Sequence, residues 1–147
     1  MSTSADTNLF LYAANPDSPR HVAATGFFSS IGEREEFVTC ELVLVELYMQ
    51  LRNRAVLARP LDAASAAAFC TRLRANPAWQ HVDYEPDVSH ALWRWAADTT
   101  VGFRRIIDAR LALTLRHHGI ERFATANEKD FREFGFERVW NPLEEDS

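Results

Sequence analysis

The chain has 147 residues, which fits one domain of roughly 100–200 residues, and 47% of them are hydrophobic, enough for a packed core. No apolar run approaches the roughly 18–20 residues of a membrane span, and the polar N-terminus predicts no signal peptide, so we expect a cytoplasmic protein. The formal charge of −5 argues against a protein that coats nucleic acid through bulk electrostatics, although it is compatible with an enzyme that binds a short stretch of strand.

In the first half of the chain, short strand patterns alternate with helical ones. Ser18, which precedes a proline, and Asp62 are expected to cap helices, and Thr39 is expected to do the same for the helix that follows it. The predicted elements are a strand over residues 1–5, a helix from about residue 8, a helix over 19–30, a strand over 37–39, and helices over 42–52 and 63–75.

The second half continues the alternation. Asp87 is expected to cap one helix, and Gly119 is expected to end the next one in the left-handed conformation that glycine adopts at helix C-termini. The predicted elements are a strand over residues 79–84, helices over 88–96 and 105–118, a strand over 120–125, a short helix over 126–131 and a strand over 136–140.

This order of elements predicts an α/β fold. We expect a three-layer αβα sandwich around a short, mostly parallel central sheet of about five strands, because parallel strands are joined by crossover helices that cover both faces. Residues 1–142 are expected to form one domain, and residues 143–147 an acidic tail. Cys40 and Cys70 lie in apolar segments and are expected to be reduced thiols in the core.

Three acidic residues are not explained by the hydrophobic pattern. Asp108 lies beside two isoleucines on the apolar side of its helix, and Glu46 lies within the apolar segment LVLVELY. Asp6 follows directly on the first strand, so it is expected at the carboxyl edge of the sheet, where α/β folds bind ligands. One interpretation is that each acid is separately satisfied in a cap or an ion pair, as Asp108 would be with a neighbouring arginine.

The other interpretation is a shared cation site. A buried carboxylate is costly unless it is paired, and several carboxylates close together repel one another unless a cation neutralises them. Ligand sets that consist only of oxygen suit hard cations such as Mg²⁺ or Mn²⁺, and such a cation promotes phosphoester hydrolysis. The residues alone therefore leave metal-assisted hydrolysis and separately satisfied acids as open alternatives.

Four segments, taken in order, resemble the PIN-domain nucleases and specifically the VapC-type toxins of bacterial toxin–antitoxin modules. They are Asp6-Thr7-Asn8, LVLVELY with Glu46, IIDARLALTLRHHG with Asp108, and Phe123-Ala124-Thr125-Ala126-Asn127 followed by Lys129-Asp130-Phe131. The resemblance covers nearly the whole chain. It implies a PIN-like nuclease domain, an endoribonuclease activity that depends on Mg²⁺ or Mn²⁺, a homodimer, and a small VapB-like antitoxin that neutralises the toxin.

The resemblance also assigns roles to residues. Asp6, Glu46 and Asp108 match the three acids that hold the metal, and Asn127 stands at a fourth catalytic position that is commonly aspartate in the family. The neutral Asn127 removes one negative charge, which Asp130 could partly replace. Thr125 matches a hydroxyl position that orients a carboxylate or a water molecule. The candidates for binding the RNA substrate are Asn8, Arg104, Arg105 and Arg110, although the arginines are equally compatible with solvent exposure or with pairing in the helix.

Other functions remain open at this point. A housekeeping RNA-processing nuclease and a degenerate PIN domain that only binds a partner are both compatible with the sequence. A phosphatase of the haloacid dehalogenase type is disfavoured, because that family needs a second aspartate where Asn8 stands. The helix over 42–51, together with Phe27 and Phe28, carries more apolar residues than one core face uses, which indicates a dimer or antitoxin surface.

Overall fold

Five parallel strands form the central sheet of the computed structural model, which describes residues 1–144 apart from the side chains of Glu33 and Arg34. The spatial order is β3-β2-β1-β4-β5, so β1 lies in the middle. The strands are β1 (Ser2–Ala5), β2 (Glu36–Cys40), β3 (Trp79–Val82), β4 (Arg122–Ala124) and β5 (Arg138–Trp140). All four pairings are parallel, which confirms the predicted α/β class.

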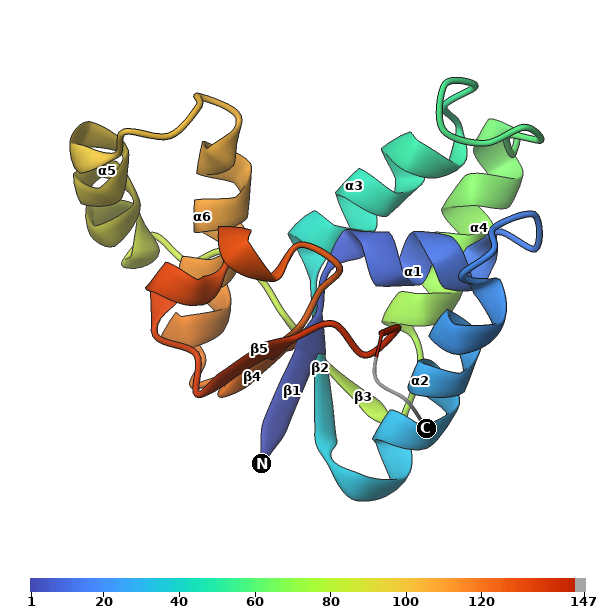
Figure 1. Cartoon of the computed structure of the whole chain (residues 1–147), viewed down its shortest axis with the longest axis horizontal. Coiled ribbons are helices and arrows are strands. Elements are labelled where there is room, and N and C mark those ends of the chain that lie inside the picture. The colour runs from blue at the N-terminus through green and yellow to red at the C-terminus, as the bar shows by residue number, and fades with distance from the viewer. Residues whose placement is uncertain (145–147) are drawn as a thin grey trace.

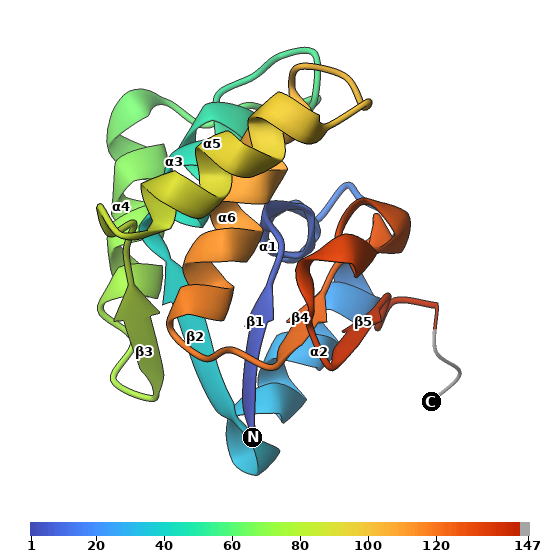
Figure 2. The same cartoon turned by 90° about the vertical axis from the view of Figure 1, so that its left-hand side faces the viewer.

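Helices cover both faces of this sheet. α6 and α5 lie on one face, and α1 and α2 lie on the other; α3 packs on α1 and α4 (Figures 1 and 2). The helices are α1 (Thr7–Ala14), α2 (His21–Arg34), α3 (Glu41–Leu51), α4 (Ala63–Arg74), α5 (Val88–Asp98) and α6 (Arg105–His117), with the 3-10 turns η1 (Glu128–Asp130) and η2 (Arg132–Phe134) between β4 and β5. None of the described helices combines the length and the apolar character needed to cross a membrane.

The register between β1 and β4 fixes where the chain leaves the sheet. Ala5 lies opposite Ala124, so the next residues, Asp6 and Thr125, emerge side by side at the carboxyl edge. The backbone N–H of Asp6 donates to the carbonyl of Ala124 at 2.9 Å, which continues the pairing by one residue. From β1 the chain builds β2 and β3 on one side and then crosses over to build β4 and β5 on the other side, so this edge is the switch point at which α/β folds bind ligands.

The core packs against both faces of the sheet. Phe123, Leu47 and Leu111 are among its fully buried side chains, and Cys40 and Cys70 are buried free thiols, as predicted. Phe28 packs against Phe10 in a tilted arrangement, with ring centroids 4.5 Å apart. Phe27 and Phe28 therefore belong to a partly buried aromatic cluster that packs on the core, and the apolar excess that is exposed lies on α3, at Val45 and Met49.

The predicted start of α4 and the predicted end of α6 are both confirmed. The side chain of Asp62 accepts a hydrogen bond from the backbone N–H of Ser65 at 2.7 Å, at the start of α4. Gly119 has a φ of 78°, and the N–H of Ile120 donates to the carbonyl of Leu115 at 3.0 Å. This pattern is the glycine-ended helix stop predicted for α6.

Other boundaries differ from the prediction. α2 begins at His21 after Arg20 rather than at the proline after Ser18, and it continues to Arg34. Thr39 does not cap α3, because β2 runs on to Cys40 and the Thr39 hydroxyl instead lies 3.0 Å from Nδ1 of His81 on β3. Asp87 precedes α5 without a side-chain capping bond. Within the predicted tail, Leu143 packs against the core, and residues 145–147 lie outside the described residues.

Candidate active site

A hollow of about 240 Å³ opens at the carboxyl edge of the sheet. α1 and α3, the first turn of α6, and the segment after β4 contribute side chains to it. The lining residues are Asp6, Thr7, Asn8, Leu11, Glu46, Gln50, Asp108 and Asn127. The structure thus brings the three predicted metal-binding acids and Asn127 to one place from four separate segments of the chain.

Asp6 is held by two hydrogen bonds on different oxygens. Its Oδ1 accepts from the backbone N–H of Thr7 at 2.8 Å, and its Oδ2 accepts from the hydroxyl of Thr125 at 2.8 Å. The backbone N–H of Asn127 in turn donates to the Thr125 oxygen at 3.0 Å. Because Thr125 is fully buried, this chain of bonds fixes the orientation of the Asp6 carboxylate relative to the segment after β4.

Burial and mutual repulsion dominate the electrostatics of the hollow. Burial raises the pKa of Asp6 to about 6, despite the hydrogen bonds from Thr125 and Thr7. The pKa of Glu46 rises to about 7, first because of burial and then because of the negative charges of Asp6 and Asp108. Burial also raises the pKa of Asp108, although the positive charge of Arg105 opposes the shift. These carboxylates would be stabilised in their ionised form by a bound cation.

The donor chemistry of the hollow fits a hard divalent cation. All its candidate ligands are oxygen donors, and the carboxylates are desolvated and repel one another, which is the condition that a cation relieves. No group of three or more histidine, cysteine, aspartate or glutamate side chains among residues 1–144 already has the arrangement of a formed metal site. Asp6, Glu46 and Asp108 are the residues that would hold the ion, with the amide oxygen of Asn127 as a neutral addition.

Arg105 and Asp130 lie beside the hollow but do not line it. Nε of Arg105 donates to Oδ2 of Asp108 at 3.1 Å, and its Nη1 lies 3.6 Å from Oδ1 of Asp130. The ion pair between Asp108 and a neighbouring arginine, one of the two interpretations of the sequence, is therefore present. It does not exclude the other interpretation, because Asp108 also lines the hollow.

The remaining arginine candidates lie away from the lining. Arg110 stacks over the ring of Tyr84, with the guanidinium carbon 4.2 Å from the ring centroid. Arg104 is exposed next to Phe103, and its guanidinium lies over that ring. Neither Arg110 nor Arg104 is among the residues that line the hollow. Asn8, in contrast, does line it, and its Oδ1 is 3.5 Å from the backbone nitrogen of Ala126.

Three lining residues were missed in the sequence: Thr7, Leu11 and Gln50. Gln50 follows Glu46 by one helical turn, so their spacing would have placed both side chains on one side of α3. Thr7 follows Asp6 directly, and its buried hydroxyl has no hydrogen-bond partner among the described residues. The sequence carries no comparable signal for Leu11, which is one apolar residue among many.

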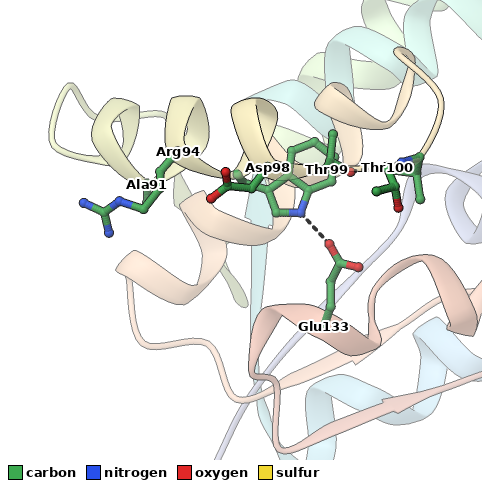
Figure 3. Close-up of a pocket in the computed structure, with 8 residues that line it drawn as sticks. Ala91, Arg94, Asp98, Thr99, Thr100 and Glu133 are labelled. Atoms are coloured by element: carbon green, nitrogen blue, oxygen red, sulfur yellow. Dashed lines mark hydrogen bonds between the residues drawn. The ribbon is translucent and has the colours of Figure 1, made fainter.

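A second hollow, of about 490 Å³, lies between α5 and η2 (Figure 3). In it the indole N–H of Trp95 donates to the Glu133 carboxylate, which reaches across from η2. Its lining holds two acids, Asp98 and Glu133, on different elements. The first hollow, with three desolvated carboxylates, is therefore the candidate active site.

Comparison with known proteins shows which family the chain resembles. The PIN domain model matches residues 5–137. Ribonuclease VapC24 of Mycobacterium tuberculosis is 48% identical over 143 residues, which cover 97% of this chain and 98% of the relative. Two solved structures share the fold at low sequence identity. VapC20 of Mycobacterium tuberculosis, a sarcin-ricin loop cleaving toxin, has a TM-score of 0.66 and 20% identity over 82% of this chain and 86% of its own.

A second of the solved structures with this fold is VapBC2 from Rickettsia felis, bound to a DNA fragment from its promoter. It has a TM-score of 0.65 and 12% identity over 96% of this chain and 98% of its own. The matched range begins one residue before Asp6 and includes Glu46, Asp108 and Asn127. The chain therefore belongs to the PIN domain family and, within it, to the VapC group.

Proposed function

We propose that this protein is a Mg²⁺-dependent endoribonuclease, the toxin of a VapBC-type toxin–antitoxin pair. The observation that carries the proposal is the hollow in which Asp6, Glu46 and Asp108 converge at the carboxyl edge of the sheet. The likeness to Ribonuclease VapC24 over nearly the whole of both chains supports RNA as the substrate. Mn²⁺ has the same preference for oxygen ligands and is expected to replace Mg²⁺.

In the proposed reaction, water attacks the phosphodiester in line with the leaving 3′-oxygen. When bound, the divalent cation supplies a positive charge for the phosphoryl oxygens and lowers the pKa of water. Glu46 lies in the hollow beside the other carboxylates and is the group proposed to accept the proton of the attacking water. The new bond joins the water oxygen to phosphorus and the P–O3′ bond breaks, which leaves 5′-phosphate and 3′-hydroxyl ends.

The other side chains hold this arrangement in place. Thr125 and the N–H of Thr7 fix both oxygens of Asp6, so that carboxylate cannot rotate away when charge changes in the hollow. The neutral Asn127 leaves the ligand set with one negative charge fewer than an aspartate would give. Asn8 and Gln50 line the hollow, and their side-chain amides are the groups proposed to donate hydrogen bonds to an RNA phosphate.

The test is cleavage of mixed RNA by the metal-free protein, with and without added Mg²⁺. We expect cleavage only with Mg²⁺, reversal by EDTA, and loss in Asp6→Asn and Asp108→Asn. Asp87→Asn is the matched control, because Asp87 is exposed and makes no capping bond. Equal cleavage by all variants would refute the site. Absence of cleavage by the wild type on any RNA would favour a degenerate PIN domain that only binds a partner.

We also infer that α3 and α4 bind the antitoxin. A groove of about 260 Å³ between them is lined mostly by apolar side chains, including Leu44, Val45 and Ala67. Exposed Val45 and the neighbouring Met49 extend this apolar surface along α3. Large exposed apolar patches mark protein interaction sites. Co-expression with the product of an adjacent small gene should yield a complex, and Val45→Asp should weaken it while leaving RNA cleavage intact.

A further inference from the structure

Arg105 joins two acidic residues that come from different elements beside the hollow. It is the first residue of α6, and its side chain is only 18% exposed. Its guanidinium contacts Oδ2 of Asp108, Oδ1 of Asp130 and the backbone carbonyl of Asp130. A planar guanidinium with several N–H donors can hold three acceptor atoms on two segments at once, which a lysine ammonium on one flexible stem does less well.

This contact decides where Asp130 lies. Asp130 is close enough to the hollow for its negative charge to raise the pKa of both Asp6 and Asp108. It nevertheless does not line the hollow, because its side chain and its carbonyl both face Arg105. Asp130 is therefore the nearby acid that could complete a second cation site beside the neutral Asn127. Its contacts with Arg105 keep its carboxylate out of the hollow.

We propose that Arg105 limits the hollow to a single divalent cation. Its guanidinium keeps the Asp130 carboxylate away from the metal ligands and supplies a fixed positive charge beside the site. This inference rests on the proposed metal-dependent function. With Asn127 neutral, the hollow itself offers three carboxylates, Asp6, Glu46 and Asp108, which suffice for one hard cation. The positive charge of Arg105 beside Asp108 further disfavours a second cation through like-charge repulsion.

The experiment measures Mn²⁺ stoichiometry on the metal-free full-length protein by calorimetry and by electron paramagnetic resonance. The wild type is expected to bind one Mn²⁺ per chain. Arg105→Gln releases Asp130 and is expected to bind a second Mn²⁺. The double variant Arg105→Gln/Asp130→Asn is expected to return to one, because the second site needs the Asp130 carboxylate.

Asp130→Asn alone is the matched control and also covers the case in which Arg105→Gln fails to fold. It is expected to bind one Mn²⁺ with an affinity much closer to that of the wild type than to that of Asp6→Asn, because Asp130 acts on the ion through its charge and is not a ligand in the wild type. A loss of affinity in Asp130→Asn comparable to that of Asp6→Asn would make Asp130 a ligand and overturn the proposal. Two equivalents in the wild type, or one equivalent in a folded Arg105→Gln, would also overturn it.

RNA cleavage by the same samples separates this proposal from the proposed function. A wild type that cleaves RNA and binds two Mn²⁺ refutes the role of Arg105 and leaves the nuclease assignment intact. A wild type that binds no Mn²⁺ refutes metal dependence, and the role of Arg105 falls with it. One bound Mn²⁺ without cleavage of any RNA refutes the nuclease assignment, while the variants still decide the role of Arg105.

Discussion

The hydroxyl of Thr125 donates a hydrogen bond to Oδ2 of Asp6 at 2.8 Å, although 119 positions separate the two residues in the chain. The parallel pairing of Ala5 with Ala124 brings them together, so the sheet itself sets this contact. Thr125 is fully buried, and the same oxygen accepts the N–H of Asn127. One hydroxyl therefore links the first and fourth segments of the proposed site.

Thr125→Val tests this link. Valine has the shape of threonine without the hydroxyl, so the variant leaves a buried carboxylate oxygen and the N–H of Asn127 without their partner. We expect the free energy of unfolding to fall by about 1–3 kcal/mol, and the Mn²⁺ affinity to fall as well. Urea unfolding and calorimetry measure the two effects, and Thr125→Ser should restore most of both.

Thr71→Val is the control for Thr125→Val. Thr71 is exposed on α4, and its hydroxyl donates a hydrogen bond to the carbonyl of Ala68 in its own helix. Its replacement is expected to change the free energy of unfolding by less than about 0.5 kcal/mol. If the two valine variants lose equal stability, the buried bond to Asp6 has no special role.

The raised pKa of Asp6 predicts how the stability of the metal-free protein depends on pH. Below pH 3.8 the carboxyl is protonated in both the folded and the unfolded states. Between pH 3.8 and about 6 the folded state binds more protons, so the free energy of unfolding falls as the pH rises. Well above pH 6 the carboxyl is ionised in both states, and the free energy of unfolding is then lower by about 3 kcal/mol for a pKa shift of this size.

Asp6→Asn removes that titration. Urea unfolding in EDTA at pH 5 and at pH 8 should show that the wild type loses more stability between the two values than Asp6→Asn does. Glu46, with a pKa of about 7, contributes a change of the same sign, which is reduced in the variant because the charge of Asp6 no longer raises that pKa, but persists because burial still does. An identical loss in both proteins would mean that Asp6 is not desolvated in solution.

A bound divalent cation should offset the destabilisation that the ionised, buried carboxylates cause. Because Mg²⁺ or Mn²⁺ binds the ionised carboxylates, we expect either ion to raise the melting temperature at pH 8 more than at pH 5. The shift should grow with ion concentration, disappear with EDTA, and be absent in Asp108→Asn. An equal shift with Na⁺ at matched ionic strength would indicate general screening rather than a site.

Local signals in the sequence predicted the fold well. The alternation of strands and helices, the cap at Asp62 and the stop at Gly119 each depend on a few adjacent residues, and all three are confirmed. Asp6, Glu46 and Asp108 stood out because charged residues interrupt apolar patterns. Their convergence follows from parallel topology, which places the ends of strands at one edge.

The errors occur where distant contacts override local preference. Thr39 resembles a helix cap, but its hydroxyl is taken by His81 on the neighbouring strand, so β2 extends past it. The position of Asp130 depends on Arg105, which is 25 positions earlier in the chain. No window of sequence shows which of several arginines will make such a contact, so the separation of Asp130 from the hollow could not be predicted.

Gly119→Ala tests the end of α6. Gly119 has a φ of 78°, a conformation that costs an L-residue about 1–2 kcal/mol, so the variant should lose about that much stability. Gly102→Ala is the matched control, because Gly102 has no positive φ and an added Cβ would meet nothing within 4 Å. Thermal unfolding compares them, and equal melting temperatures would show that α6 can end without the left-handed residue.

The expected homodimer is tested at the exposed apolar residues of α5, α6 and the segment between them. Phe103 is 84% exposed and Trp93 is 61% exposed, and Val101 and Ile107 add to the same region. Large apolar side chains that lie exposed in one region favour self-association. The double variant Trp93→Ser/Phe103→Ser is therefore expected to be a monomer when its mass is measured by light scattering. Val22→Ser is the control, since Val22 is 80% exposed on α2, outside this region. If wild type and double variant have the same mass, these residues do not form the dimer contact.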